Sequence, residues 1–399
     1  MKRYLFALLL ILCSIVPTSC GHRTLLTNVS ISPSLITPNA DGSDDVAVFK
    51  YTLTRQASIS IYLIDAAGER HGFRVEKRRS KGARSANFSG VVDGTLLPDG
   101  DYTCLFEATD EDGYMESQSL PITLVDGDPV PMEITGLSVY PAKFTPNRDG
   151  ITDRVSISYN LSKEADQVRV YVVDAEGNEY AVAEDSIREV GAVGPHQNDY
   201  DAGIDLGSPP PADGEYTVVV EVEDAVGNQA RVEAPLTIEG GGVPRVEIVN
   251  AAAEFSPLVV PLGDTLTFTC TVKNTGLVPV RTGGPESGTT YTTSQNYNTL
   301  EEYEDPGLFR IGLDYEGNSS GREYPFRWQL GTDEELTTIE TDIGPQLYLM
   351  PGQTVTVVGH LQITDEPSKV APYYWIGLLH ESVEVVQDQV ESTQISIGF

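Results

Sequence analysis

The feature that most constrains the fold is an internal repeat. The stretch TPNADGSDD at residues 37–45 returns as TPNRDGITD at 145–153, and alternating runs, VAVFKYTLT and RVSISYNLS, follow the two copies. Further along, SISIYLIDAAGE at 58–69 matches VRVYVVDAEGNE at 168–179, and LPDGDYTCLFEATDEDGY at 97–114 matches PADGEYTVVVEVEDAVGN at 211–228. The chain therefore builds one domain twice, and each copy has an ordinary domain size.

Within each copy, apolar residues alternate with polar ones. One run carries Val155, Ile157, Tyr159 and Leu161 on a single face. This period of two is typical of strands buried on one face, and no window keeps a helical period. Asp-Gly, Pro-Asp-Gly and Gly-Asn pairs separate the runs at positions where turns are expected. Several short antiparallel strands in a domain of this size predict an immunoglobulin-like or fibronectin-III-like β-sandwich.

The chain from residue 242 onward repeats neither copy, but it also alternates, as in GDTLTFTCTVKNTG and PGQTVTVVGHLQIT. Clusters of Pro and Gly, VDGDPVP at 125–131 and EGGGVP at 239–244, provide the linkers. We predict an all-β protein of three tandem sandwiches after a signal peptide. Its predicted segments are a signal peptide at 1–20, a tether at 21–27, repeats at 28–127 and 128–241, and a distinct sandwich at 242–399 with a long insertion at 281–330.

The N-terminus predicts export. Lys2 and Arg3 precede an apolar run from Tyr4 to Val16 that suits a secretory signal and is too short to span a bilayer. Thr18 and Ser19 before Cys20 resemble a bacterial lipobox, in which the cysteine is acylated, although Pro17 stands where that pattern prefers an aliphatic residue. The alternatives are a lipid anchor on Cys20 and ordinary secretion. Either one predicts an extracytoplasmic protein of the cell envelope or surface.

The charge balance excludes one class of partner. The formal net charge is −33, whereas a nucleic-acid-binding protein needs clustered cations. Such acidity is typical of a solubilising surface, and it also favours multivalent cations such as Ca²⁺.

The TPNxDG loops offer oxygen ligands of the kind that Ca²⁺ prefers. The predicted ligands are Asn39, Asp41 and Asp45 in the first copy and Asn147, Asp149 and Asp153 in the second. The spacing departs from an EF-hand loop because Gly42 comes too early. The alternatives are a structural calcium site and a tight turn whose Asn and Asp side chains accept backbone N–H groups.

No catalytic motif fits its required context, so we predict no enzymatic activity. GNSSG at 317–321 matches the nucleophile elbow by letter but lies in a polar loop without a following helix. HESVE at 380–384 has Glu384 where a zinc-binding helix needs its second His. Cys104 and Cys270 stand on the apolar faces of alternating runs and predict buried, unpaired thiols.

Aromatic residues gather in the third domain and offer a surface for a glycan or a protein partner. The alternative is that these rings fill the core. The residues predicted for such a surface are Tyr291, Tyr297, Tyr303, Tyr324, Trp328 and Trp375.

The order of motifs in residues 25–240 resembles the Ig-like domain of flagellar hook-capping proteins. The shared motifs are TPNxDG, a strand ending in DxxG, then LPDGxY and AxDxxG, but Val92 replaces the family's usual Trp. The third domain is similar to bacterial cell-adhesion-related Ig-like modules, through GDTLTFTCTVKNTG and MPGQTVTV. These resemblances imply a structural or adhesive scaffold that displays its C-terminal domain. The alternatives are a carbohydrate-binding accessory protein and a subunit of an envelope or appendage assembly.

Overall fold

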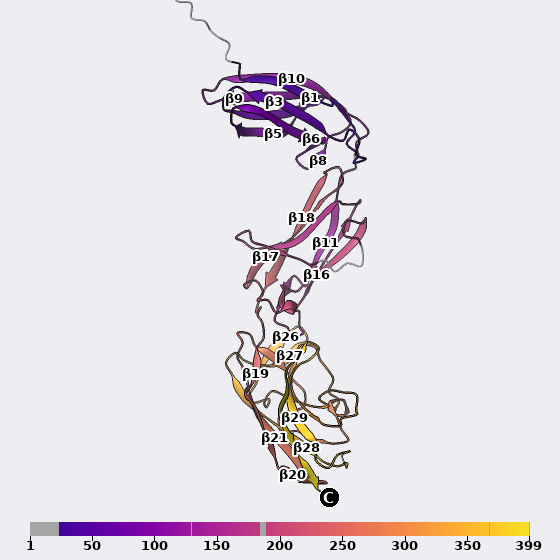
Figure 1. Ribbon diagram of the computed structural model, residues 1–399, viewed down its shortest axis with the longest axis vertical. Coiled ribbons are helices and arrows are strands. Elements are labelled where there is room, and N and C mark those ends of the chain that lie inside the picture. The colour runs from indigo at the N-terminus through magenta and orange to yellow at the C-terminus, as the bar shows by residue number, and fades with distance from the viewer. Residues whose placement is uncertain (1–23, 129, 184–188, 367, 399) are drawn as a thin grey trace, which may run out of the picture. The chain divides into compact units, whose positions relative to one another are not determined.

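The computed structural model describes residues 24–128, 130–183, 189–366 and 368–398. Almost all regular structure in these residues is β-strand (Figure 1). Contacts divide the chain into two compact units, Met1–Pro131 with Glu223–Gln229, and Met132–Val222 with Ala230–Phe399. The predicted all-β fold of Ig-like sandwiches is therefore confirmed. The predicted signal peptide and Cys20 lie outside the described residues.

The first sandwich packs a three-stranded sheet against a five-stranded one. The smaller sheet has the order β1 (Leu26–Ser32), β3 (Ala47–Leu53), β6 (Gly82–Phe88), and the larger β2 (Leu35–Ile36), β10 (Met115–Leu124), β9 (Gly100–Asp110), β4 (Ala57–Ile64), β5 (Arg70–Arg79). A separate hairpin pairs β7 (Val91–Val92) with β8 (Thr95–Leu96). The alternate residues of β3 are buried, as the sequence predicts, and Phe49 stacks on Phe88 in the core.

The second sandwich repeats the two main sheets of the first strand for strand, without a counterpart of the β7–β8 hairpin among its described residues. Its smaller sheet has the order β11 (Ile134–Tyr140), β13 (Val155–Leu161), β16 (Gly194–Tyr200), and its larger sheet β12 (Lys143–Phe144), β18 (Gln229–Ile238), β17 (Gly214–Glu223), β14 (Gln167–Val173), β15 (Glu179–Ala181). A short 3-10 helix, η1 (Ile204–Leu206), follows β16. The internal repeat in the sequence is thus a repeat of structure.

The third sandwich is larger. One sheet has the order β19 (Val246–Ser256), β21 (Thr265–Asn274), β28 (Thr354–Gln362), β23 (Thr290–Thr292). The other has the order β26 (Thr337–Thr341), β27 (Gly344–Leu349), β22 (Val280–Thr282), β24 (Phe309–Tyr315), β29 (Tyr373–His380), β30 (Glu384–Gln394), with β25 (Phe326–Gln329) also on β24. A two-stranded pair joins β20 (Val259–Pro261) to β31 (Ser396–Gly398), and η2 (Tyr297–Leu300) is a 3-10 turn.

The segment at 281–330 is not an insertion into this sandwich, which corrects that prediction. It supplies strands β23, β24 and β25 and most of β22. Strand β24 is central and buried on both faces, so its sequence FRIGLDY lacks the alternation that marks a half-exposed strand.

Candidate functional site

The two TPNxDG loops have the same internal hydrogen bonds. In the first, the Asp45 carboxylate accepts the backbone N–H groups of Asn39, Ala40 and Gly42 at 3.2, 3.0 and 2.7 Å. In the second, Asp153 accepts those of Asn147, Arg148 and Gly150 at 3.0, 2.7 and 2.6 Å. The Asn and Asp side chains therefore close a tight turn, which is the local alternative to a metal site.

The surroundings of the two loops differ. In the first loop the residues from Asn39 to Asp44 are exposed. In the second, Asn147 and Asp149 are buried, with 8% and 6% of their surface exposed. The difference arises because the third sandwich, which belongs to the same compact unit, covers the second loop. We call this contact the joint, formed by residues 145–153 with Pro306, Gly307, Tyr348 and His380.

Hydrogen bonds and close backbone packing hold the joint. The Tyr348 hydroxyl donates to Asp149 Oδ2 at 2.8 Å, and His380 Nε2 donates to the Arg148 carbonyl at 2.8 Å. The imidazole also stacks on Phe309, with ring centroids 4.1 Å apart. A methyl group at Gly150 would lie 1.9 Å from the Pro306 carbonyl oxygen, so the two backbones touch here.

Burial shifts the titrating groups of the joint. It raises the pKa of Asp153 to about 6, with the neighbouring Asp149 charge as a second cause. Burial also raises the pKa of Asp149, which the hydrogen bond from Tyr348 opposes. For His380, burial lowers the pKa to about 4, so the ring is neutral near pH 7 and donates through one nitrogen.

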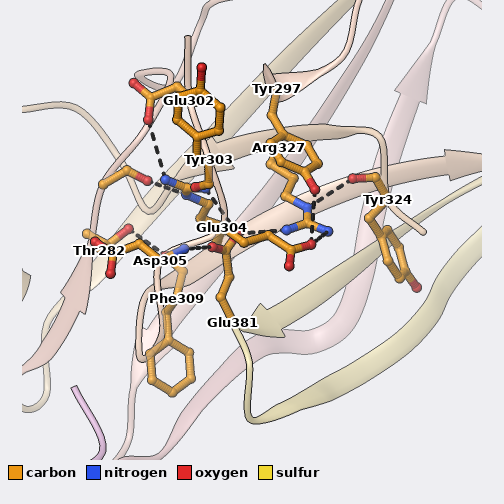
Figure 2. Close-up of polar contacts among 12 residues, drawn as sticks. Thr282, Tyr297, Glu302, Tyr303, Glu304, Asp305, Phe309, Tyr324, Arg327 and Glu381 are labelled. Carbon is orange, nitrogen blue, oxygen red and sulfur yellow. Dashed lines mark hydrogen bonds and ion pairs between the residues drawn. The ribbon is translucent and has the colours of Figure 1, made fainter. Parts of the chain in front are cut away.

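The third sandwich contains a buried ionic network that is close in sequence to the joint (Figure 2). Glu381, next to His380 in the chain, accepts from Arg310 NH1 at 3.1 Å and from Arg327 NH1 at 2.9 Å through the same Oε1. Its Oε2 accepts the backbone N–H of Asp305 at 2.9 Å. All three charged side chains of this network are at most 8% exposed. Glu381 thus links β24, which carries Arg310, and β25, which carries Arg327, to Asp305 in the segment before β24.

The network supports the joint directly. Arg281, fully buried, donates to the Pro306 carbonyl at 2.6 Å and to Asp305 at 3.0 Å. The backbone N–H of Gly307 donates to the Glu381 carbonyl at 2.9 Å. These bonds fix residues 305–307, which touch Gly150 of the second repeat.

The guanidinium groups are engaged by the chain itself. Arg310 donates from Nε to the Gly283 carbonyl at 2.6 Å and from NH1 to the Tyr303 carbonyl at 2.9 Å. Arg327 donates from Nε to the Tyr324 carbonyl at 3.0 Å, and its cation lies 4.2 Å from the Tyr297 ring centroid. The network therefore positions backbone segments and does not present free donors to an anion.

The predicted aromatic surface is largely interior. Tyr291, Tyr297, Tyr324 and Trp328 are buried, at 0%, 2%, 3% and 0% exposure. The indole of Trp328 donates to the Thr289 carbonyl and packs edge-on against Phe268. Only Tyr303, which is exposed, and Trp375, which is partly buried, keep ring surface for a ligand among the six. The core alternative applies to the other four because their hydroxyls and indole find partners inside the domain.

The motifs set aside on sequence grounds lie where their chemistry has no support. GNSSG occupies an exposed turn between β24 and β25, without a helix after it. His380 and Glu384 face each other across the β29–β30 hairpin. Cys104 and Cys270 are free and buried, and burial raises the pKa of each thiol to about 12.

Six residues that build the joint and its support were not predicted from the sequence: Arg281, Arg310, Arg327, Tyr348, His380 and Glu381. A signal was present in LFRIGL and PFRWQL, where an arginine interrupts an apolar run. A charge placed among core residues is rarely buried without a partner, so each of these arginines called for a carboxylate.

Comparison with known proteins gives no assignment by sequence. No family model matches the chain, and no curated protein matches it. Among solved structures, a tetra-tandem repeat from the extending region of a large adhesion protein aligns over 94% of this chain and 91% of its own, at 15% identity and TM-score 0.21. A Ca²⁺-stabilised adhesin with which an Antarctic bacterium binds ice aligns over 87% and 74%, at 14% identity and TM-score 0.21.

A third structure, the alpha-2-macroglobulin of E. coli, aligns over 94% of this chain but 23% of its own, at 13% identity and TM-score 0.19. All three TM-scores are too low to support an argument about function. The sheets themselves define the class, a tandem all-β protein of Ig-like sandwiches. In the described part of the chain, no helix has the length and apolar character needed to cross a bilayer.

Proposed function

We propose that this chain is an exported, lipid-anchored scaffold of the cell envelope that displays its third domain to a partner. In this proposal Cys20 carries the anchor, the repeats act as spacers, and the partner is an extracellular or envelope protein or a glycan. The proposed role is interaction, without catalysis.

The observation that carries this proposal is the joint. If the second and third domains did not pack together, the polar groups of the loop at 145–153 would face water. Here Asp149 is buried against Tyr348, and His380 bonds the Arg148 carbonyl. A buried and hydrogen-bonded contact between consecutive domains stiffens the connection, whereas flexible relative motion is the usual expectation. Stiffness is what a spacer needs in order to hold a displayed domain away from its anchor.

Stiffness can be measured by single-molecule energy transfer across the joint. Dyes on Cys substituted at the exposed Ser138 and Thr356 report the distance between the two domains. Cys104 and Cys270 stay unlabelled because both are buried. The protein would lack residues 1–19 and carry Cys20→Ser. We expect one narrow distance distribution.

The matched variants are Gly307→Ala and Gly352→Ala, which both place alanine at a positive φ. A methyl group at Gly307 would lie 2.1 Å from the Asp149 carbonyl carbon, whereas one at Gly352 meets nothing within 4 Å. Gly307→Ala should broaden the distribution and Gly352→Ala should not. A broad distribution in the unsubstituted protein would refute the spacer role.

The anchor is tested separately. Growth with a labelled fatty acid should mark the full-length protein, and Cys20→Ser should abolish the label and release the protein from the membrane fraction. An unlabelled protein that still fractionates with membranes would contradict lipidation, without bearing on the joint.

A further inference from the structure

One hairpin turn recurs in both repeats, so the hydrogen bonds of its copies can be compared with those of one site in the first repeat. Four turns of the two repeats share the pattern Asp-x-x-Gly, beginning at Asp65, Asp110, Asp174 and Asp224. In each, one carboxylate oxygen accepts backbone N–H groups of the turn, as Asp65 Oδ1 does from Ala67 at 2.9 Å and Glu69 at 2.8 Å. The turns also share the backbone bond between the aspartate and the residue four positions later.

The second carboxylate oxygen distinguishes the four turns. Asp110 Oδ2 receives Arg55 Nε at 2.8 Å, and Asp224 Oδ2 receives the Asn228 amide at 2.9 Å. Asp174 Oδ2 receives both the Asn178 amide at 2.8 Å and the Tyr180 hydroxyl at 3.2 Å. Three of the four turns therefore bring a hydrogen-bond donor to this oxygen.

The turn at Asp65 replaces both donors of its counterpart. Glu69 stands where the second repeat has Asn178, and His71 stands where it has Tyr180. Within the described residues, Asp65 Oδ2 contacts only His71 Nε2, at 3.4 Å, which is long for a hydrogen bond. Two carboxylates and an imidazole thus surround one point, with one ligand atom from each lying within 4.8 Å of the others.

We propose that Asp65, Glu69 and His71 bind a zinc ion at the β4–β5 turn. Tetrahedral zinc with bonds of ~2.0–2.1 Å separates two ligand atoms by about 3.3 Å, close to the distance between Asp65 Oδ2 and His71 Nε2. Glu69 is exposed, so its side chain is free to move the remaining distance to the ion.

The turn is also built to orient its first ligand. Asp65 Oδ1 is held by two backbone N–H groups, and such supporting bonds fix ligands in metal sites. An imidazole ligand favours zinc over calcium, which prefers oxygen alone. With three protein ligands, the fourth position is left for water.

The experiment titrates the soluble protein, without a metal-binding tag, with zinc chloride in a calorimeter. We expect one site whose affinity falls at least about tenfold in His71→Ala, because the loss of a residue that only supports a ligand already costs about 10–100-fold. Tyr180→Ala, at the matching position of the second repeat, should leave the affinity unchanged. Calcium chloride should not compete, because the site depends on the imidazole.

A grafted site sharpens the test. Asn178→Glu with Tyr180→His copies the first turn onto the second repeat and should raise the stoichiometry from one zinc to two. Weak binding by the many surface acids does not depend on His71 and would be the same in every variant. Equal zinc binding by His71→Ala and the unsubstituted protein, with melting curves showing both folded, would overturn the proposal.

Discussion

The two TPNxDG loops show how one motif serves two roles. Both close the same turn with the same hydrogen bonds, yet residues 39–44 of the first loop are exposed, whereas Asn147, Asp149 and Ile151 of the second are buried in the joint. The local geometry follows from the Asn, Asp and Gly residues of the motif. Burial is decided by the neighbouring domain, which in the second copy supplies Tyr348, His380 and the backbone at Gly307.

The differences between the copies fit their surroundings. Ser43 of the first loop is exposed, and its counterpart Ile151 is buried at 6% exposure. Ala40 is replaced by Arg148, whose carbonyl accepts from His380 and whose side chain donates to the Asp205 carbonyl at 3.1 Å. The apolar Ile151 in an otherwise polar turn therefore distinguishes the loop in the joint from the exposed loop.

The largest expected effect comes from the support beneath the joint. Glu381→Gln removes the buried carboxylate that Arg310 and Arg327 share, and it leaves each guanidinium a more exposed partner, Glu302 at 37% or Glu304 at 56% exposure. Breaking a buried ion pair typically costs about 3–5 kcal/mol. Both tryptophans, Trp328 and Trp375, lie in the third domain, so urea unfolding followed by tryptophan fluorescence reports this domain. The control is Glu302→Gln, because Glu302 is 37% exposed and 3.5 Å from Arg310. Its expected cost is about 0–1 kcal/mol. Equal losses would show that Glu381 does not hold the receiving surface.

The next effect tests the comparison at one position. Gly150 and Gly42 occupy the same place in the two loops, with φ of 81° and 85°. Alanine at either position meets the penalty of a positive φ, about 1 kcal/mol. At Gly150 the methyl group would also clash with the Pro306 carbonyl, whereas at Gly42 nothing lies within 4 Å. Gly150→Ala should therefore cost at least about 2 kcal/mol more, since the joint must shift. Similar losses in melting measurements of the two variants would mean that the joint does not form.

The local structure could be predicted from the sequence, whereas the contacts between residues far apart in the chain could not. Strands such as β3 and β13 follow from alternation, because a half-buried strand records its burial in its own sequence. The turn geometry of both loops follows from Asx chemistry. The joint does not, because Tyr348 lies far along the chain from Asp149 and no local pattern links them. The burial of Tyr297 and Trp328 could not be predicted either, because aromatic rings occur both in cores and on surfaces.

The pH dependence of the joint is expected to be small in the intact protein and large in two variants. The pKa of Asp153 is raised to about 6, so this group stabilises the fold less as pH rises from about 4 to 6. The pKa of His380 is lowered to about 4, so its contribution is present above its ordinary value of 6.5 and is lost as pH falls toward 4. Burial also raises the pKa of Asp149, which acts in the same direction as Asp153, and the His380 trend opposes both carboxyl groups.

Removing either titrating group should reveal the pH dependence that the other contributes. Asp153→Asn should make the third-domain unfolding midpoint fall more steeply than in the unsubstituted protein between pH 6.5 and 4. In His380→Gln the midpoint should fall less steeply than in the unsubstituted protein, because the Asp153 carboxyl with its raised pKa then dominates the pH dependence. Measuring each variant as a difference from the unsubstituted protein cancels the titration of distant groups. Parallel pH profiles in all three proteins would show that neither group is buried in a joint.

Calcium should produce the smallest effect, and it should discriminate between the loops. In the docked loop, Asp153 accepts three backbone N–H groups, Asp149 Oδ1 accepts that of Ile151, and Asp149 Oδ2 accepts the Tyr348 hydroxyl. These oxygens already have partners, so a cation there would have to displace a buried hydrogen bond. In the exposed loop, Asp41 and Asp44 remain open to solvent and offer the easier site.

The unfolding transition reported by tryptophan fluorescence should therefore occur at the same temperature in millimolar calcium and in EGTA. Any rise in melting temperature should be confined to the first repeat and lost in Asp41→Asn. A calcium-dependent shift of the third-domain transition would reverse the assignment, because it would make the buried loop the metal site.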